Sequence, residues 1–158
     1  MGRIARRVRQ AGVYFVTTDT WQKHPLFINT VMANIVVDQI VSRRDRGFYA
    51  LHAFVVMPDH LHVLLTPSET TSIEKAMQMI KGGSAHKIGL ERPNEFPVWH
   101  LGFHDRWIRD TEEYRGSKSY IEQNPVVARL SEAAEGYPFS SASGSYVLDP
   151  SRFDAARG

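Results

Sequence analysis

The sequence predicts an α+β sandwich in which helices flank a central antiparallel sheet. Stretches with strand and helix patterns follow one another as strand, helix, strand, strand, helix, strand, helix. Only Pro58-Asp59 separates the second and third strands, so these two form a hairpin and part of the sheet is antiparallel. The first six elements match the split β-α-β pattern, which is the ferredoxin-like arrangement.

Residue type and spacing define the first strand and helix. Residues 12–18 are aromatic and β-branched, which favours a strand. Apolar residues with helical spacing begin at Ile28, and we expect this helix to run to about Val41. A basic turn that ends at Gly47 follows it.

The central hairpin and the second helix come next. Residues 48–57 are apolar on both faces, as expected for a central strand that is covered on two sides. Residues 60–66 form the third strand. The stretch 71–74 (TSIE) has the pattern of a capping box, and the helix that it begins should stop near Gly82-Gly83.

The last part of the chain contains one more strand and one more helix. The aromatic-rich stretch 97–108 contains the fourth strand. Asp110 with Glu113 marks a helix start, and we expect the helix to reach about Asn124, because Pro125 disfavours its continuation. Residues after Gly136 are expected to form a loosely structured tail.

The composition fits one compact globular domain. The chain has 158 residues, of which 42% are hydrophobic and 23% charged, and it contains no cysteine, which excludes disulfides and thiolate chemistry. No apolar run approaches the roughly 20 residues that span a bilayer. We therefore expect a cytoplasmic protein without membrane contact.

The net charge of +2 is too small to indicate a partner, but the cationic residues are clustered. Such clusters can neutralise the phosphates of a polyanion, although a solvated tail and a charged helix end explain them equally well. The first cluster consists of Arg3, Arg6, Arg7 and Arg9, and the second of Arg43, Arg44 and Arg46.

His60 and His62 are the first candidate functional residues. Side chains two apart on a strand lie on the same face, so both imidazoles point one way while Leu61 and Val63 point into a core. Two such histidines can chelate a divalent ion. Two surface histidines on a half-exposed strand are the alternative, and the spacing alone does not decide between them.

Tyr120 and Asn124 form the second candidate pair. Residues four apart share a helix face, so the phenol and the amide converge on one spot. A tyrosine becomes a useful nucleophile when a cation or base lies nearby, and an amide oxygen suits Mg²⁺ or Mn²⁺. The alternatives are an aromatic at the edge of the core and a helix cap.

A third cluster is formed by His104, Asp105 and Arg106. The carboxylate could orient a metal-bound histidine and the arginine could grip a phosphate, whereas a local salt bridge explains the cluster equally well. Four aromatics could stack on unpaired bases, and we expect at least half of them to be core residues. These are Trp21, Trp99, Phe103 and Trp107.

Blocks along most of the chain resemble the REP-associated tyrosine transposases, a subgroup of the IS200-like, or HUH, single-strand tyrosine transposases. The resemblance covers roughly residues 12 to 142 in the expected order. The blocks are 12–17 (GVYFVT), 54–65 (FVVMPDHLHVLL), 78–83 (QMIKGG), 99–106 (WHLGFHDR), 120–126 (YIEQNPV) and 137–142 (YPFSSA). The chain differs at Val127, where many relatives have a basic residue, at Arg129, where glycine is frequent, and at His100, where glutamine is common.

The resemblance implies an HUH endonuclease fold and a role for each candidate residue. It implies that His60 and His62 bind a divalent metal, Mg²⁺ or Mn²⁺, and that Asn124 completes the site. It further implies that Tyr120 attacks a DNA phosphate, forms a covalent 5′-phosphotyrosine and leaves a free 3′-OH. Tyr114 and Tyr137 are competing nucleophiles. Tyr114 has Lys118 four residues later, which is no metal ligand, and Tyr137 lies beside a proline in the tail.

These observations predict a metal-dependent single-strand DNA transposase that cleaves and rejoins DNA, acting at REP-type hairpins. A domesticated hairpin-DNA-binding protein without cleavage activity is the alternative. A phosphohydrolase would need a further histidine where Leu64 stands, and the later blocks fit a relaxase or replication initiator less well.

The expected organisation is a basic arm over residues 1–11, an HUH transposase domain over 12–142 and a C-terminal tail over 143–158. The predicted DNA contacts come from the arginines of the arm together with His104 and Arg106. The expected partner is single-stranded or hairpin DNA, bound by a monomer or a homodimer in a prokaryotic, nucleoid-associated setting.

Overall fold

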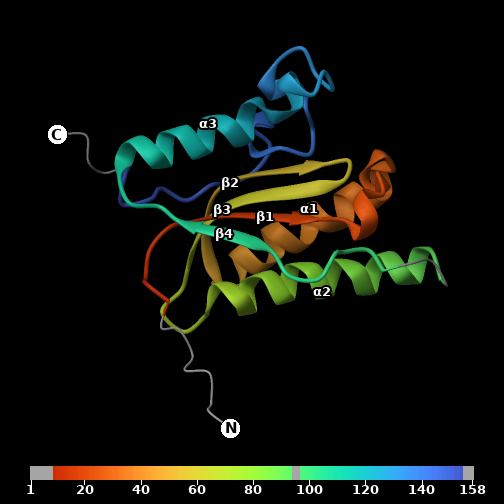
Figure 1. Ribbon diagram of the computed structural model, residues 1–158, viewed down its shortest axis with the longest axis horizontal. Coiled ribbons are helices and arrows are strands. Elements are labelled where there is room, and N and C mark those ends of the chain that lie inside the picture. The colour runs from red at the N-terminus through yellow and green to blue at the C-terminus, as the bar shows by residue number, and fades with distance from the viewer. Residues whose placement is uncertain (1–8, 94–96, 155–158) are drawn as a thin grey trace, which may run out of the picture.

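The computed structural model describes residues 9–93 and 97–154 of the chain. Its strands and α-helices follow one another in the predicted order (Figure 1). They are β1 (Tyr14–Asp19), α1 (Thr30–Asp45), β2 (Tyr49–Met57), β3 (His60–Pro67), α2 (Ile73–Glu91), β4 (His104–Trp107) and α3 (Thr111–Val127). Short 3₁₀ turns join some of them: η1 (Trp21–Lys23), η2 (Leu26–Ile28), η3 (Ala134–Gly136) and η4 (Ser141–Ser143).

The described strands form one antiparallel sheet in the order β2-β3-β1-β4. β2 and β3 pair through the predicted hairpin, with Met57 opposite His60. β1 pairs with both β3 and β4, so each helical connection carries the chain over a neighbouring strand. This is the ferredoxin-like order, and the predicted fold class is confirmed.

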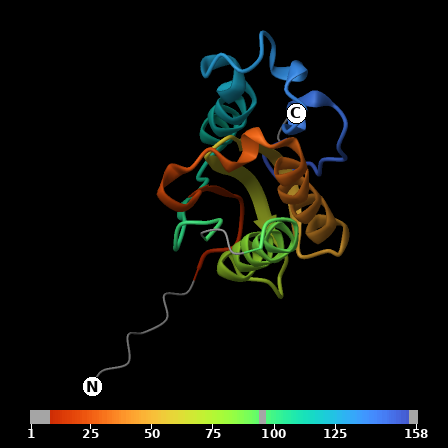
Figure 2. The same cartoon turned by 90° about the vertical axis from the view of Figure 1, so that its right-hand side faces the viewer.

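The sheet separates two layers of helices. α1 and α2 pack together on one face and α3 covers the other, as Figure 1 shows from the front and Figure 2 from the side. Successive side chains of β3 point to opposite faces of the sheet and so contribute to both cores. Leu61 and Val63 belong to the core under α1 and α2, whereas Leu64 belongs to the core under α3. No helix within the described residues is both long and apolar enough to span a membrane.

α1 begins later and ends later than predicted. Its cap is Asn29, whose side-chain oxygen accepts hydrogen bonds from the backbone N–H groups of Val31 and Met32. Ile28 lies before the helix and is exposed, so the buried face of the helix starts at Met32. The helix then continues to Asp45, which includes the basic residues that were predicted to form a turn.

α2 does not stop at Gly82-Gly83, and this prediction is wrong. The helix starts after Ser72, whose hydroxyl accepts from the Lys75 N–H, and it runs through both glycines to Glu91. A side chain on Gly83 would overlap with Gln39 of α1, whereas nothing lies within 4 Å of a Cβ on Gly82. Gly83 therefore permits close packing of two helices rather than ending one.

α3 follows its predicted cap but passes through Pro125. The Asp110 side chain accepts from the Glu113 N–H, as predicted. The helix continues to Val127 and ends in a Schellman arrangement in which the Leu130 N–H bonds to the Pro125 carbonyl. Arg129 takes the left-handed conformation of this cap, with φ of 60°. Glycine adopts this conformation without strain.

The prediction of a loosely structured tail is wrong for residues 137–154. Tyr137 and Phe153 are buried in the core under α3, and Ser140 forms a bridge with Val55 of β2. Asp149 accepts hydrogen bonds from the Leu51 N–H and from Arg44. This segment therefore packs against β2 and α1, and the packing continues beyond residue 142.

Candidate active site

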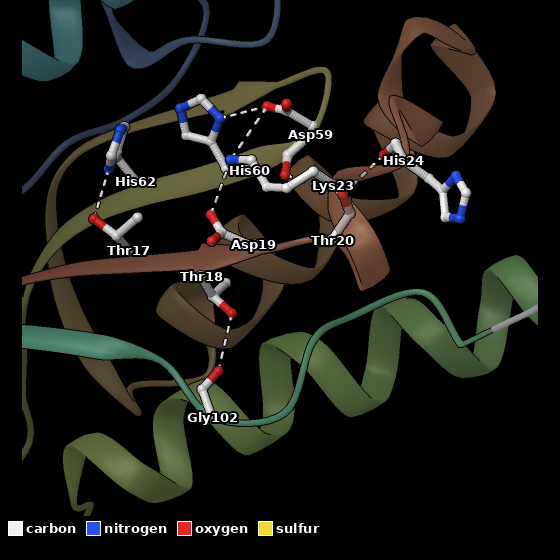
Figure 3. Close-up of polar contacts among 10 residues, drawn as sticks. All are labelled: Thr17, Thr18, Asp19, Thr20, Lys23, His24, Asp59, His60, His62 and Gly102. Atoms are coloured by element: carbon white, nitrogen blue, oxygen red, sulfur yellow. Dashed lines mark hydrogen bonds and ion pairs between the residues drawn. The ribbon is translucent and has the colours of Figure 1, made fainter.

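β3 places the two predicted metal-binding histidines side by side on the face that α3 covers. The rings of His60 and His62 have centroids 4.8 Å apart. His62 is buried, and its Nδ1 lies 2.8 Å from the Thr17 hydroxyl on β1. The Nδ1 of His60 lies 2.7 Å from a carboxylate oxygen of Asp59 (Figure 3). Each imidazole is therefore held at its Nδ1 by a neighbouring oxygen.

Because these contacts are made at Nδ1, the Nε2 atoms are available for a ligand. A carboxylate or hydroxyl oxygen that accepts from Nδ1–H leaves the Nε2 lone pair free. The Nε2 atom of His62 is buried and has no hydrogen-bond partner among the described residues. Burial, followed by the charge of His60, lowers the pKa of His62 to about 3, so this ring is neutral near pH 7, as a metal ligand must be. The histidine pair therefore fits a divalent cation.

The third predicted ligand, Asn124, is half-buried one turn beyond Tyr120 on α3. No described contact joins its side chain to the histidines. Within residues 9–93 and 97–154, no cluster of three or more His, Cys, Asp or Glu side chains could hold a metal. A metal at His60 and His62 therefore needs further ligands of another kind, such as an amide, water or the substrate.

The predicted nucleophile stands next to the histidines and is open to solvent. The ring of Tyr120 lies 5.3 Å from the ring of His62 and 6.1 Å from that of Phe15, each measured between centroids. Tyr120 is 56% exposed. A phenol that protrudes from the last helix therefore meets the imidazole of the third strand, within a single chain.

The two competing tyrosines are structural. Tyr114 is buried, and its hydroxyl donates to Asp154 at 3.0 Å. Tyr137 is also buried, and its hydroxyl donates to the Val56 carbonyl at 2.8 Å. Burial raises the pKa of each phenol to about 12, which disfavours the phenolate that attacks phosphorus. Of the three candidate tyrosines, Tyr120 is the one that is exposed.

A cleft of about 990 Å³ lies between the α3 face of the sheet and the first turns of α3. It joins His62 and Tyr120 to two of the predicted DNA-binding residues, His104 and Arg106 of β4. The lining residues are Phe15, Thr17, His62, His104, Arg106, Arg109, Asp110, Glu112, Glu113, Gly116, Ser117 and Tyr120. The cleft is large enough for part of a polynucleotide strand and contains both histidine and arginine donors.

Arg9, the arm residue that the structure describes, does not line this cleft. Arg9 pairs with Glu74 at 2.7 Å and with Asp105 at 2.5 Å, and Asp105 alternates with the two cleft residues of β4. Asp105 therefore contacts Arg9 rather than a histidine, and the carboxylate that contacts one of the predicted metal-binding histidines is that of Asp59. The remaining arm residues, Arg3, Arg6 and Arg7, lie outside the described residues.

Most of the candidate stacking aromatics, and one arginine of the second basic cluster, have structural roles. Trp99 is buried, and Phe103 and Trp107 pack against the core under α1 and α2, which confirms the expectation that at least half are core residues. Trp21 instead stacks on His100, with ring centroids 6.2 Å apart. In the second basic cluster, Arg44 forms salt bridges with Asp45 and Asp149.

Several cleft residues were not found from the sequence. Phe15 and Thr17 are two residues apart on β1, and both line the cleft. Their spacing predicts that they share a face of the sheet, but it does not predict which face carries the site. Arg109 and Glu113 had no recognisable signal of function, because Glu113 also fits a helix start. These two residues line the cleft because the fold brings β4 and α3 together.

Comparison with known proteins identifies the family. The family model described as "Transposase IS200 like" matches residues 14–124, which is more than half of the chain. The chain belongs to the IS200-like transposase family. This makes it a member of a class of DNA-processing enzymes.

Individual relatives of this IS200-like protein agree with the resemblance found in its sequence blocks. It is 28% identical to the REP-associated tyrosine transposase of Escherichia coli K12, over 94% of this chain and 90% of that protein. A solved REP-associated tyrosine transposase bound to a REP hairpin is 26% identical, with a TM-score of 0.69 over 96% of this chain and 92% of that one. A candidate transposase from Deinococcus radiodurans R1 shares the fold, with 22% identity and a TM-score of 0.55 over 78% of this chain and 97% of that one.

Proposed function

We propose that this protein is a metal-dependent single-strand DNA transposase that cleaves and rejoins DNA through a 5′-phosphotyrosine on Tyr120. The observation that carries the proposal is the contact between the exposed Tyr120 phenol and the His62 ring, at the edge of a cleft that also contains arginines. A nucleophile, candidate metal ligands and phosphate-binding groups thus share one site.

The histidine pair supports a resident divalent ion. His60 and His62 would hold Mg²⁺ or Mn²⁺ through their Nε2 atoms, with Asn124 as a further ligand from α3. When bound, such an ion polarises the scissile phosphate and offsets its growing negative charge. Thr17 and Asp59 keep the two rings in the orientation that this role requires.

The chain's own residues carry out the exchange. The Tyr120 oxygen attacks the phosphorus and loses its proton to solvent at the open side of the cleft. The bond between phosphorus and the 3′-oxygen breaks, and that oxygen takes up a proton and leaves as a 3′-OH. A second 3′-OH then attacks the phosphotyrosine and releases the phenol, so the number of phosphodiester bonds is conserved and no nucleotide cofactor is needed. His104 and Arg106 bind the strand in the cleft.

The proposed substrate is DNA with a REP-type hairpin and a single-stranded flank. The support is the similarity, over nearly the whole chain, to a REP-associated tyrosine transposase that was solved with a REP hairpin. The open cleft beside Tyr120 suits an unpaired flank, because a phosphate in an unpaired strand can turn towards the phenol.

The test is covalent attachment to a labelled single strand that carries a REP-type hairpin, incubated with Mn²⁺ and analysed on a denaturing gel. Tyr120→Phe should abolish the adduct while hairpin binding persists, and Tyr114→Phe should keep it, because Tyr114 is buried. His60→Ala should lose metal-dependent cleavage. Adducts that persist in Tyr120→Phe would refute the assignment. Hairpin binding without any adduct in the wild type would instead identify a binding protein that does not cut.

The same assay tests how many chains build one site. The contact between Tyr120 and His62 lies within one chain, so a monomer suffices in this proposal. A mixture of Tyr120→Phe and His60→Ala should therefore remain inactive. Restored adduct formation in the mixture would show that a homodimer exchanges its tyrosines.

A further inference from the structure

Glu113 holds two arginines that line the cleft. Its Oε1 lies 3.1 Å from Nε of Arg106, and its Oε2 lies 3.0 Å from Nε of Arg109. The Glu113 side chain is only 16% exposed, whereas the arginine side chains are 59% and 75% exposed. One partly buried carboxylate on α3 thus fixes a cation from β4 and another from the loop before α3.

The two arginines keep donors available for a ligand. Arg106 donates from Nη2 to the buried Ser117 hydroxyl at 3.1 Å and lies over the Phe15 ring at 5.3 Å. Arg109 makes contact only through Nε among the residues that the structure describes. Guanidinium groups bind phosphate through paired N–H donors, and the terminal nitrogens of Arg109 remain free of described partners.

The position of this cluster relates it to the proposed chemistry. Glu113, Ser117 and Tyr120 all line the cleft from α3. Glu113 and Tyr120 are seven positions apart on the helix, which is about 10 Å at 1.5 Å per residue. A phosphate held at Arg109, which is anchored only on Glu113 among the described residues, is therefore a different one from the phosphate beside Tyr120. Arg106 also contacts Ser117, one turn before Tyr120, and so lies between the two positions.

We infer that Arg106 and Arg109 form a second phosphate-binding subsite for the DNA strand, and that Glu113 is the positioning residue that aims both guanidinium groups into the cleft. This subsite rests on the proposed function, in which a single strand lies in the cleft. It holds the strand at a neighbouring phosphate while Tyr120 faces the scissile one, which restricts how the strand can slide.

The role of Glu113 can be tested by asking whether its substitution strengthens or weakens DNA binding. Removing a negative charge from a cleft that binds a polyanion should strengthen binding by electrostatics alone. If Glu113 positions the arginines, its removal should weaken binding despite the more favourable charge. Glu112 is the matched control, because it also lines the cleft, is exposed and makes no described ion pair.

The experiment measures binding of fluorescein-labelled dT20 by fluorescence anisotropy at several salt concentrations, without divalent metal. Glu113→Gln should weaken binding by on the order of threefold, whereas Glu112→Gln should leave it unchanged or strengthen it. Arg109→Gln should weaken binding on the order of fivefold and reduce the salt slope by about 0.7, the value for one phosphate contact to a single strand. Arg115→Gln is the control for Arg109→Gln, because Arg115 is exposed on α3 and does not line the cleft. It removes the same charge but should weaken binding less and leave the salt slope closer to that of the wild type.

Two outcomes would overturn the inference. One is a Glu113→Gln protein that binds more tightly, as Glu112→Gln does. The other is an Arg109→Gln protein that cannot be distinguished from Arg115→Gln. Thermal melting of each variant identifies any that fails to fold, and Arg109→Gln then remains as a test in an exposed position. Because the assay needs no cleavage, its result is independent of whether Tyr120 forms an adduct.

Discussion

At the scale of single residues, the site depends on which nitrogen of each histidine is free. Thr17 and Asp59 contact the Nδ1 atoms, and the buried Nε2 of His62 lacks a partner within the described residues. An unpaired buried polar atom costs free energy, so its presence next to an exposed phenol indicates a site that a ligand completes. In the proposed metal site, the hydroxyl of Thr17 orients His62 so that its Nε2 faces the ion.

The contribution of Thr17 can be measured with a substitution of similar shape. Thr17→Val removes the oxygen that contacts His62 Nδ1, so we expect the affinity for Mn²⁺ to fall about tenfold. Thr18→Val is the control, because the Thr18 hydroxyl donates to the Gly102 carbonyl on the other face of the sheet. Titration calorimetry without DNA provides the measurement. Equal Mn²⁺ affinities for the two variants would show that Thr17 does not orient a ligand.

At the scale of elements, the same residue type has different roles at neighbouring positions. Gly82 and Gly83 are adjacent in the middle of α2, but only Gly83 faces α1. A Cβ on Gly83 would overlap with Oε1 of the buried Gln39 and would lie 2.9 Å from its Cδ. The packing of α1 against α2 therefore determines why the second glycine is needed.

This difference predicts opposite effects of two alanine substitutions. Gly82→Ala should raise the free energy of unfolding by about 0.5–1 kcal/mol, because alanine restricts the unfolded chain and favours the helix. Gly83→Ala should lower it by about 1 kcal/mol, because Gln39 must be displaced. Urea denaturation of both variants measures the two changes. Equal stabilisation by both substitutions would show that the helices do not approach this closely.

At the scale of the whole molecule, the C-terminal segment, residues 137–154, contacts the helical layers on both faces of the sheet. Asp149 accepts from Nε and Nη2 of Arg44 at the end of α1 and from the Leu51 N–H of β2. The neighbouring His52 is buried between the Asp149 carbonyl and the Thr66 hydroxyl. Phe153 completes the core beneath α3, the helix that carries Tyr120. The segment thus helps to hold α3, with Tyr120, on the sheet.

Loss of the Asp149 carboxylate should therefore destabilise the fold. We expect Asp149→Ala to lower the free energy of unfolding by about 2–3 kcal/mol, because it removes charge-assisted hydrogen bonds and leaves the Leu51 N–H without its partner. Asp45→Ala removes the other, exposed partner of Arg44 and should cost less than about 1 kcal/mol. Urea denaturation compares the two. A cost for Asp149→Ala no larger than that for Asp45→Ala would show that the segment is not docked in solution.

Local patterns in the sequence determined the order of the elements and the main candidates for chemistry. The alternation of His60 with Leu61 and His62 determines that both imidazoles share a face, and the hairpin at Pro58-Asp59 determines the pairing of β2 with β3. The cap at Asp110 likewise determines where α3 begins. Each of these features depends on a few consecutive residues, so it can be read without knowledge of the rest of the chain.

Only the tertiary structure decided which distant residues meet. It placed Tyr120 against His62, buried the competing tyrosines and paired Arg9 with Asp105 away from the cleft. It also showed that Gly83 belongs inside a helix and that residues 137–154 are packed. These outcomes depend on contacts between faces of elements far apart in the sequence, and local spacing does not encode which face will find which partner.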